Sequence, residues 1–158
     1  MTRAVIAALL LCSFPAQAGA PVRSSGNLGL GLGGGYWLNG LSAKYYMGGN
    51  ALQGVVGGYG LGHDGYGGLG FTGDYLWEMP ALTNNEAFEL GWNAGLGVSV
   101  GLGDNWFAAG AHGTLGLEFN INPVPIDVVL EYKPGITVVP GIGADLWNFG
   151  GHIRVYPF

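Results

Sequence analysis

Hydrophobic and polar residues alternate along most of this chain after its first twenty residues. The clearest run is residues 87–102, AFELGWNAGLGVSVGL, where nearly every second residue is apolar and the residues between are mainly glycine or polar. Residues 68–79 and 107–121 repeat the pattern. Because successive side chains of a β-strand point to opposite faces, a period of two predicts strands with one apolar face and one small or polar face. No helical period occurs beyond residue 20, so we expect an all-β fold.

Turn-forming residues divide the chain into eight expected strands. These are residues 27–38, 41–48, 53–62, 68–79, 87–102, 106–121, 126–133 and 144–157. Asn39-Gly40 is a two-residue hairpin signal, and the longest connection away from the termini is expected over 133–143. Most of the strands reach or exceed the ~9–11 residues that a tilted membrane strand requires. An even number of antiparallel strands can close into a barrel that leaves no backbone edge unbonded in lipid.

The composition decides which way the apolar face points. The 158 residues include 33 glycines, 49% are hydrophobic, only 9% are charged, and the net charge is −5. Soluble domains carry about 25% charged residues, and nucleic-acid binders need a basic surface. A soluble barrel would have to expose its glycine-rich face to water. We therefore predict an eight-stranded antiparallel up-and-down transmembrane β-barrel with an apolar exterior and a polar, glycine-rich lumen; a secreted soluble β-protein is the alternative.

The first twenty residues have the features of a cleaved secretory signal peptide. Arg3 precedes an apolar run over residues 4–11, and small residues offer cleavage sites after Ala18 or Ala20. The one cysteine, Cys12, lies inside this segment, so the barrel would contain no disulfide. We predict two parts, the signal peptide at 1–20 and an outer-membrane barrel at 21–158. The expected partners are outer-membrane lipids and, during insertion, periplasmic chaperones and the barrel-assembly machinery.

Strand parity places most of the charged residues on the small, polar face. An unpaired charge in a narrow interior is costly, so we expect cations and carboxylates from neighbouring strands to pair there. The predicted lumen charge network is Lys44, Asp74, Glu78, Glu89, His112, Glu118, Asp127, Glu131 and Arg154, with Lys133 on the same parity. Because eight strands enclose little space, a filled lumen is favoured over a narrow channel, which stays open as an alternative.

Aromatic residues cluster near the expected strand ends, where membrane barrels form interfacial girdles. The predicted girdle consists of Trp37, Tyr45, Trp77, Trp92, Trp106, Tyr132, Trp147 and Tyr156. Tyr156 and Phe158 at the end of the last strand are the kind of signal that insertion machinery recognises.

Catalytic and metal chemistry find little support in the sequence. The spacing in His112-Gly-Thr114, with Ser99 and Glu118 or Glu131 nearby, is similar to that in barrel enzymes that modify lipid A, and this is kept as an alternative. His63, His112 and His152 are scattered without metal-ligand spacing. We expect no cofactor, no metal, no nucleic acid and no catalytic residue.

Four segments resemble a known family. Residues 40–46 (GLSAKYY), 74–77 (DYLW), 125–134 (PIDVVLEYKP, followed by Pro140) and 150–158 (GGHIRVYPF) are similar to small uncharacterised bacterial outer-membrane barrels of the OmpA-like type, best known from spirochaetes. The resemblance covers roughly residues 28–158; Tyr46, where the family would have tryptophan, and His152 and Pro157 depart from it. It implies an eight-stranded outer-membrane barrel and brings no established activity. We therefore expect a monomeric, non-enzymatic barrel with a structural or surface-interaction role.

Overall fold

The computed structural model describes residues 22–35, 37–59, 67–121 and 124–157. The predicted signal peptide and Phe158 lie outside these residues. Strands and connections make up the described chain. The strands are β1 (Leu28–Gly35), β2 (Leu38–Tyr46), β3 (Asn50–Tyr59), β4 (Gly68–Glu78), β5 (Thr83–Asn84), β6 (Phe88–Gly103), β7 (Trp106–Ile121), β8 (Ile126–Tyr132), β9 (Gly135–Val139), β10 (Gly143–Asp145) and β11 (Phe149–Val155).

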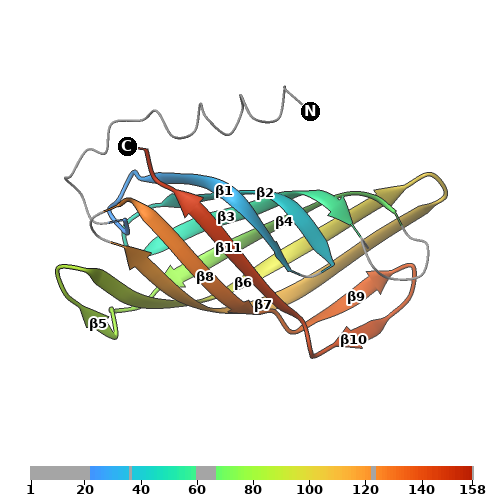
Figure 1. The fold of residues 1–158 in the computed structure, drawn as a ribbon. Helices are drawn as coiled ribbons and strands as arrows, with labels where there is room; N and C mark the ends of the chain where they lie inside the picture. The colour runs from blue at the N-terminus through green and yellow to red at the C-terminus, as the bar shows by residue number, and fades with distance from the viewer. Residues whose placement is uncertain (1–21, 36, 60–66, 122–123, 158) are drawn as a thin grey trace, which may run out of the picture.

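The sheet closes on itself. β1, β2, β3, β4, β6, β7, β8 and β11 pair in this order, every pair is antiparallel, and β11 returns to β1. The predicted all-β, eight-stranded antiparallel barrel is therefore confirmed. β1 begins and β11 ends at one end of the barrel, here called the terminal end, on the left of Figure 1. The β1–β2 and β6–β7 connections lie at the opposite, distal end.

The last two strands of the barrel are interrupted, which differs from the prediction. β7 has 16 residues and β8 only 7, so the distal half of β7 would be left without a neighbour on that side. β9 pairs there, with His112 opposite Gly135, and β10 folds back on β9. The expected loop at 133–143 is therefore mainly a β-hairpin, and the expected strand at 144–157 is divided into β10 and β11.

Two turn predictions also differ from the structure. Asn39 and Gly40 lie inside β2, where they pair with Gly34 and Gly33 of β1. The chain instead reverses just before them, where Trp37 has a positive φ of 66°. The connection expected between the strands at 68–79 and 87–102 contains the short strand β5, whose Thr83 pairs with Leu90 of β6.

The two faces of the barrel wall have opposite chemistry. Outward side chains are large and apolar, and Leu32, Leu69 and Leu96 are 66%, 70% and 63% exposed. Among the residues that the structure describes, eighteen polar or charged ones are buried, against nine hydrophobic ones. A water-soluble protein buries its apolar side chains and exposes its charges, so this barrel has the reverse arrangement.

Glycine allows the inner side chains to fit within so narrow a barrel. Gly97 of β6 lies opposite both Asp74 and His112, and a Cβ there would come within 2.5 Å of a polar atom of each. At the terminal end a Cβ on Gly91 would come within 2.8 Å of the Arg23 guanidinium. These glycines therefore leave the space that the charged side chains occupy inside the barrel.

Candidate functional site: a charged network in the lumen

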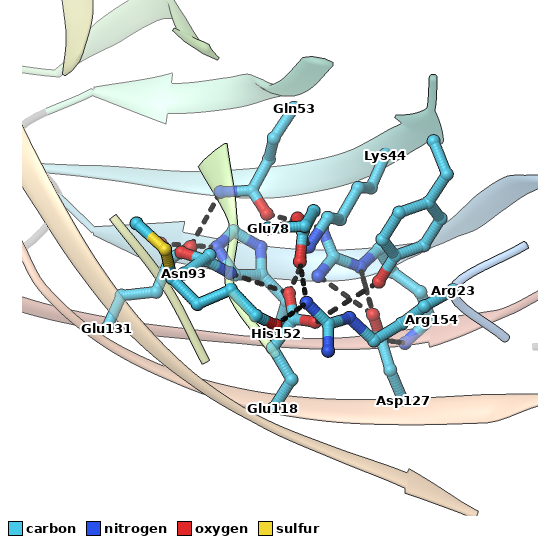
Figure 2. A network of polar contacts seen from close by, with 12 residues as sticks. Arg23, Lys44, Gln53, Glu78, Asn93, Glu118, Asp127, Glu131, His152 and Arg154 are labelled. Carbon is cyan, nitrogen blue, oxygen red and sulfur yellow. Dashed lines mark hydrogen bonds and ion pairs between the residues drawn. The ribbon is translucent and has the colours of Figure 1, made fainter. Parts of the chain in front are cut away.

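Arg23 and Lys44 join three glutamates at the terminal end of the lumen, Glu78, Glu89 and Glu118. Figure 2 shows the two cations with Glu78 and Glu118. The Arg23 guanidinium donates to Glu78 at 2.8 Å, to Glu89 at 3.2 Å and to the carbonyl of Met79 at 2.8 Å. Lys44 pairs with Glu78 at 2.8 Å and with Glu118. Burial disfavours the charge of Arg23, but the Glu78 and Glu118 carboxylates outweigh this effect and raise the pKa of the guanidinium.

The segment that carries Arg23 is packed into the barrel opening. Val22 is 3% exposed and belongs to an apolar cluster with Tyr46, Ala51, Leu76 and Tyr156. Gly26 and Asn27 extend the sheet, because the Gly26 N–H donates to the Tyr46 carbonyl and the Asn27 carbonyl accepts from the Tyr46 N–H. The residues before β1 thus close the terminal end with both charge and apolar contact.

Arg154 and Asp127 form a second group of the network, near the terminal ends of β11 and β8. The Arg154 Nε lies 3.0 and 3.1 Å from the two Asp127 oxygens, and Tyr156 donates its hydroxyl to the same carboxylate at 2.6 Å. Gln53 accepts from Arg154 Nη1 at 2.6 Å and donates to Glu131 at 2.7 Å. The Gln53 amide therefore connects the terminal and distal halves of the lumen.

The distal part is built around Glu131 and Asp74. Lys133 Nζ lies 3.0 Å from Glu131 and 2.9 Å from Asp74, so one ammonium joins two carboxylates. His152 contacts Glu131 at 2.9 Å through Nε2 and Ser42 at 3.0 Å through Nδ1. His112 lies 2.8 Å from the Asp74 carboxylate.

All six lumen carboxylates are paired. Within the described chain the network holds four permanent cations, Arg23, Lys44, Lys133 and Arg154, and each carboxylate makes an ion pair with at least one of them. Three of these cations, Arg23, Lys44 and Lys133, each pair with more than one carboxylate. Sharing keeps the charges in this interior partnered, where an isolated ion would cost several kcal/mol.

The nine residues predicted for the lumen all lie in this network, together with Lys133. Eight of them are buried, and the Glu78 side chain is 4% exposed. Sequence reasoning missed the residues Arg23, Gln53, Asn93, His152, Tyr46 and Tyr156. Parity could have found most of these, because Tyr46 follows Lys44 by two positions, and His152 and Tyr156 flank Arg154 by two. Arg23 had no strand pattern around it; only the shortage of cations in the predicted network pointed to a missing one.

Two residues of the predicted aromatic girdle are on the inner face. Tyr156 is 2% exposed, and its ring lies 5.8 Å from that of Tyr46 inside the barrel. Trp106 has the same parity as His112, and its ring is 5.4 Å from that of Tyr59. The remaining members lie outside the lumen: Tyr45, Trp77, Trp92 and Tyr132 on outward strand positions, and Trp37 and Trp147 in exposed connections.

The Thr114 hydroxyl donates to Asp74 at 2.8 Å, to the same oxygen that contacts His112. A hydroxyl nucleophile would have to give its proton to a base, and here the carboxylate takes the hydrogen bonds of both groups. Ser99 is buried two positions along β6 from Gly97, which faces His112. The arrangement resembles the rest of the network more than a nucleophile activated by histidine.

No group of three or more His, Cys, Asp or Glu side chains that could hold a metal ion occurs in the described ranges. Nor does any helix there have the length and hydropathy needed to cross a bilayer. In comparisons with protein-family models, with curated proteins and with solved structures, nothing matches this chain.

Proposed function

We propose that this chain is an exported, integral outer-membrane β-barrel with a lumen filled by its own side chains. The observation that carries the proposal is the reversed distribution of polarity: leucine, valine and phenylalanine face outward and ionised groups face inward. Burial of apolar area is worth about 25 cal/mol per Å², so an apolar belt of this kind is stable against lipid and unstable against water. The closed sheet supports the same setting, since hydrocarbon offers no partners for a free strand edge.

The lumen network supports a closed barrel over a channel. Arg23, Lys44, Arg154 and Lys133 all lie inside the barrel, and each is held by carboxylates. A permeating ion would have to separate such pairs, and breaking a buried pair costs about 3–5 kcal/mol. We infer a non-conducting, monomeric and non-enzymatic barrel that serves the envelope structurally or contacts other molecules through its distal connections. Its partners are outer-membrane lipids and, during insertion, periplasmic chaperones and the assembly machinery.

Cell fractionation and gel migration test the membrane setting. The protein is expected in the detergent-extractable outer-membrane fraction, and unheated samples should migrate differently from boiled ones. Recovery in the soluble periplasmic or secreted fraction would refute the proposal.

Two further measurements separate the closed barrel from its alternatives. Purified protein in planar bilayers should give no conductance steps, whereas regular steps would establish a channel. Mass spectra of lipid A from cells with and without the protein should be identical; a mass change abolished by His112→Ala would establish an enzyme.

A further inference from the structure

A pocket of about 410 Å³ opens at the distal rim of the barrel. It lies between the β1–β2 connection and the segment that joins β10 to β11. Two tryptophans, Trp37 and Trp147, and three polar residues, Asn39, Asp145 and Asn148, line it above a glycine floor. Its size is within the range of about 300–1,000 Å³ for small-molecule sites, and barrel mouths are among their usual locations.

The segment that presents Trp147 is fixed on both sides. Asp145 accepts the Trp147 N–H at 3.3 Å and the Asn148 side-chain amide at 3.0 Å. The Leu146 carbonyl accepts the Tyr132 hydroxyl at 2.8 Å. In spite of this anchoring, the Trp147 side chain remains outside the packing, with the residue 83% exposed. The hydrogen bonds fix the backbone that carries Trp147 and leave the residue exposed, so packing within the barrel does not require so large a side chain.

The opposite side of the pocket contains an unusual backbone. Trp37 has a φ of +66°, a left-handed conformation that is rare for a bulky side chain and costs on the order of 1–3 kcal/mol. Glycine would be the ordinary choice at such a turn. Next to it, a side chain on Gly34 would overlap with the Asn39 amide oxygen. The glycine thus leaves room for the Asn39 amide to lie against the strand at the pocket wall.

These groups match the chemistry of a sugar. A pyranose ring has apolar C–H faces that stack on a flat aromatic surface, and a rim of hydroxyls that both donate and accept hydrogen bonds. Trp147 offers the flat surface, the Asn39 amide offers a donor and an acceptor, and the Asp145 carboxylate offers acceptors. A lipid tail could not use the polar residues. A quaternary ammonium ion, which aromatic cages also bind, has no N–H to use the carboxylate and amide oxygens.

We propose that this distal rim pocket binds a small neutral saccharide, with Trp147 as the stacking surface and Asn39 and Asp145 as hydrogen-bonding groups. Asn148 is a positioning residue, because its amide holds Asp145. The inference deepens the surface-contact role within the proposed function. A single small pocket of this kind is expected to bind weakly, with a Kd of about 1 mM. The sugar could come from lipopolysaccharide in the same membrane or from glycans outside the cell.

Titrations of the folded protein in detergent test the proposal. Intrinsic tryptophan fluorescence is followed with methyl glucoside, methyl galactoside, N-acetylglucosamine and maltose, with a dephosphorylated lipopolysaccharide core oligosaccharide, and with choline. Saturable binding of a free sugar or of the core oligosaccharide supports the proposal, and which of the two binds identifies the source. Absence of saturable binding by every saccharide, or binding of choline alone, overturns it.

Variants locate the binding. Trp147→Ala should weaken the saccharide found in the titrations by about tenfold, because one aromatic stacking contact is lost. Asn39→Ala should weaken it similarly, with binding followed by ligand-observed NMR. Trp77→Ala is the matched control, since Trp77 is 42% exposed on an outward position outside the pocket. Equal affinity of Trp147→Ala and Trp77→Ala would refute the site. Heat-dependent gel migration shows separately whether each variant is still a folded barrel, so a failure of sugar binding is distinct from a failure of the membrane proposal.

Discussion

Replacing Arg23 by alanine should destabilise the barrel strongly, although Arg23 lies outside every strand. The guanidinium pairs with Glu78 and Glu89 and lies 3.6 Å from Glu118. Lys44 would still pair with Glu78 and Glu118. Among the described residues, the hydrogen-bond partner left to Glu89 would be the Asn84 amide, at a long 3.5 Å. The variant therefore leaves excess negative charge at the terminal end of the lumen.

The size of the effect follows from burial. Removing one partner of a buried ion pair costs about 3–5 kcal/mol, because the other charge remains without compensation. The Arg23 and Glu89 side chains keep 12% and 11% exposure, so water can partly solvate the carboxylate that is left. We therefore expect the free energy of unfolding to fall by about 3 kcal/mol, the lower end of the range for a broken buried ion pair.

Urea unfolding of the protein folded into lipid vesicles, followed by tryptophan fluorescence, measures this loss as a lower midpoint at unchanged slope. Ser25→Ala, at an exposed position in the same segment, is the matched control. In the Arg23→Ala background, Glu89→Gln should restore about 1–2 kcal/mol, because it removes the uncompensated charge. A loss below about 0.5 kcal/mol for Arg23→Ala, or a Glu89→Gln effect that is the same in both backgrounds, would refute the reasoning.

Three further substitutions probe the wall, the lumen and the outer face. Gly97→Val should prevent folding into the heat-modifiable form, because its side chain would overlap with His112 and the carboxylate beside it; normal gel migration would contradict this. Tyr156→Phe should cost about 1.5–3 kcal/mol in vesicle unfolding, because Asp127 loses a charge-assisted hydrogen bond; an unchanged midpoint would count against the inner placement of the ring. Leu96→Arg, on the outward face, should lower stability in vesicles by about 2–4 kcal/mol if lipid surrounds that face, and an effect near zero would place the face in water.

The strands and their faces could be predicted because alternation is a local property of the chain. A strand exposes successive residues to opposite sides whatever it pairs with, so Lys44, Glu118 and Arg154 could be assigned to the polar face without knowledge of their partners. The same rule extends to Tyr46 and Tyr156. The assignment of Tyr156 and Trp106 to the girdle was wrong because residue type and nearness to a strand end were given more weight than parity.

Pairings across the lumen depend on closure of the barrel, which no local pattern encodes. Gln53 meets Arg154, 101 residues away, and Ser42 meets His152, 110 residues away. The interruption of the last two strands also depends on the tertiary structure, because β9 pairs with the part of β7 that extends beyond β8. Arg23 belongs to the lumen because the chain before β1 folds into the opening that eight closed strands create. The alternating sequence thus determines which side chains face inward, while the curvature and register of the closed sheet select their partners.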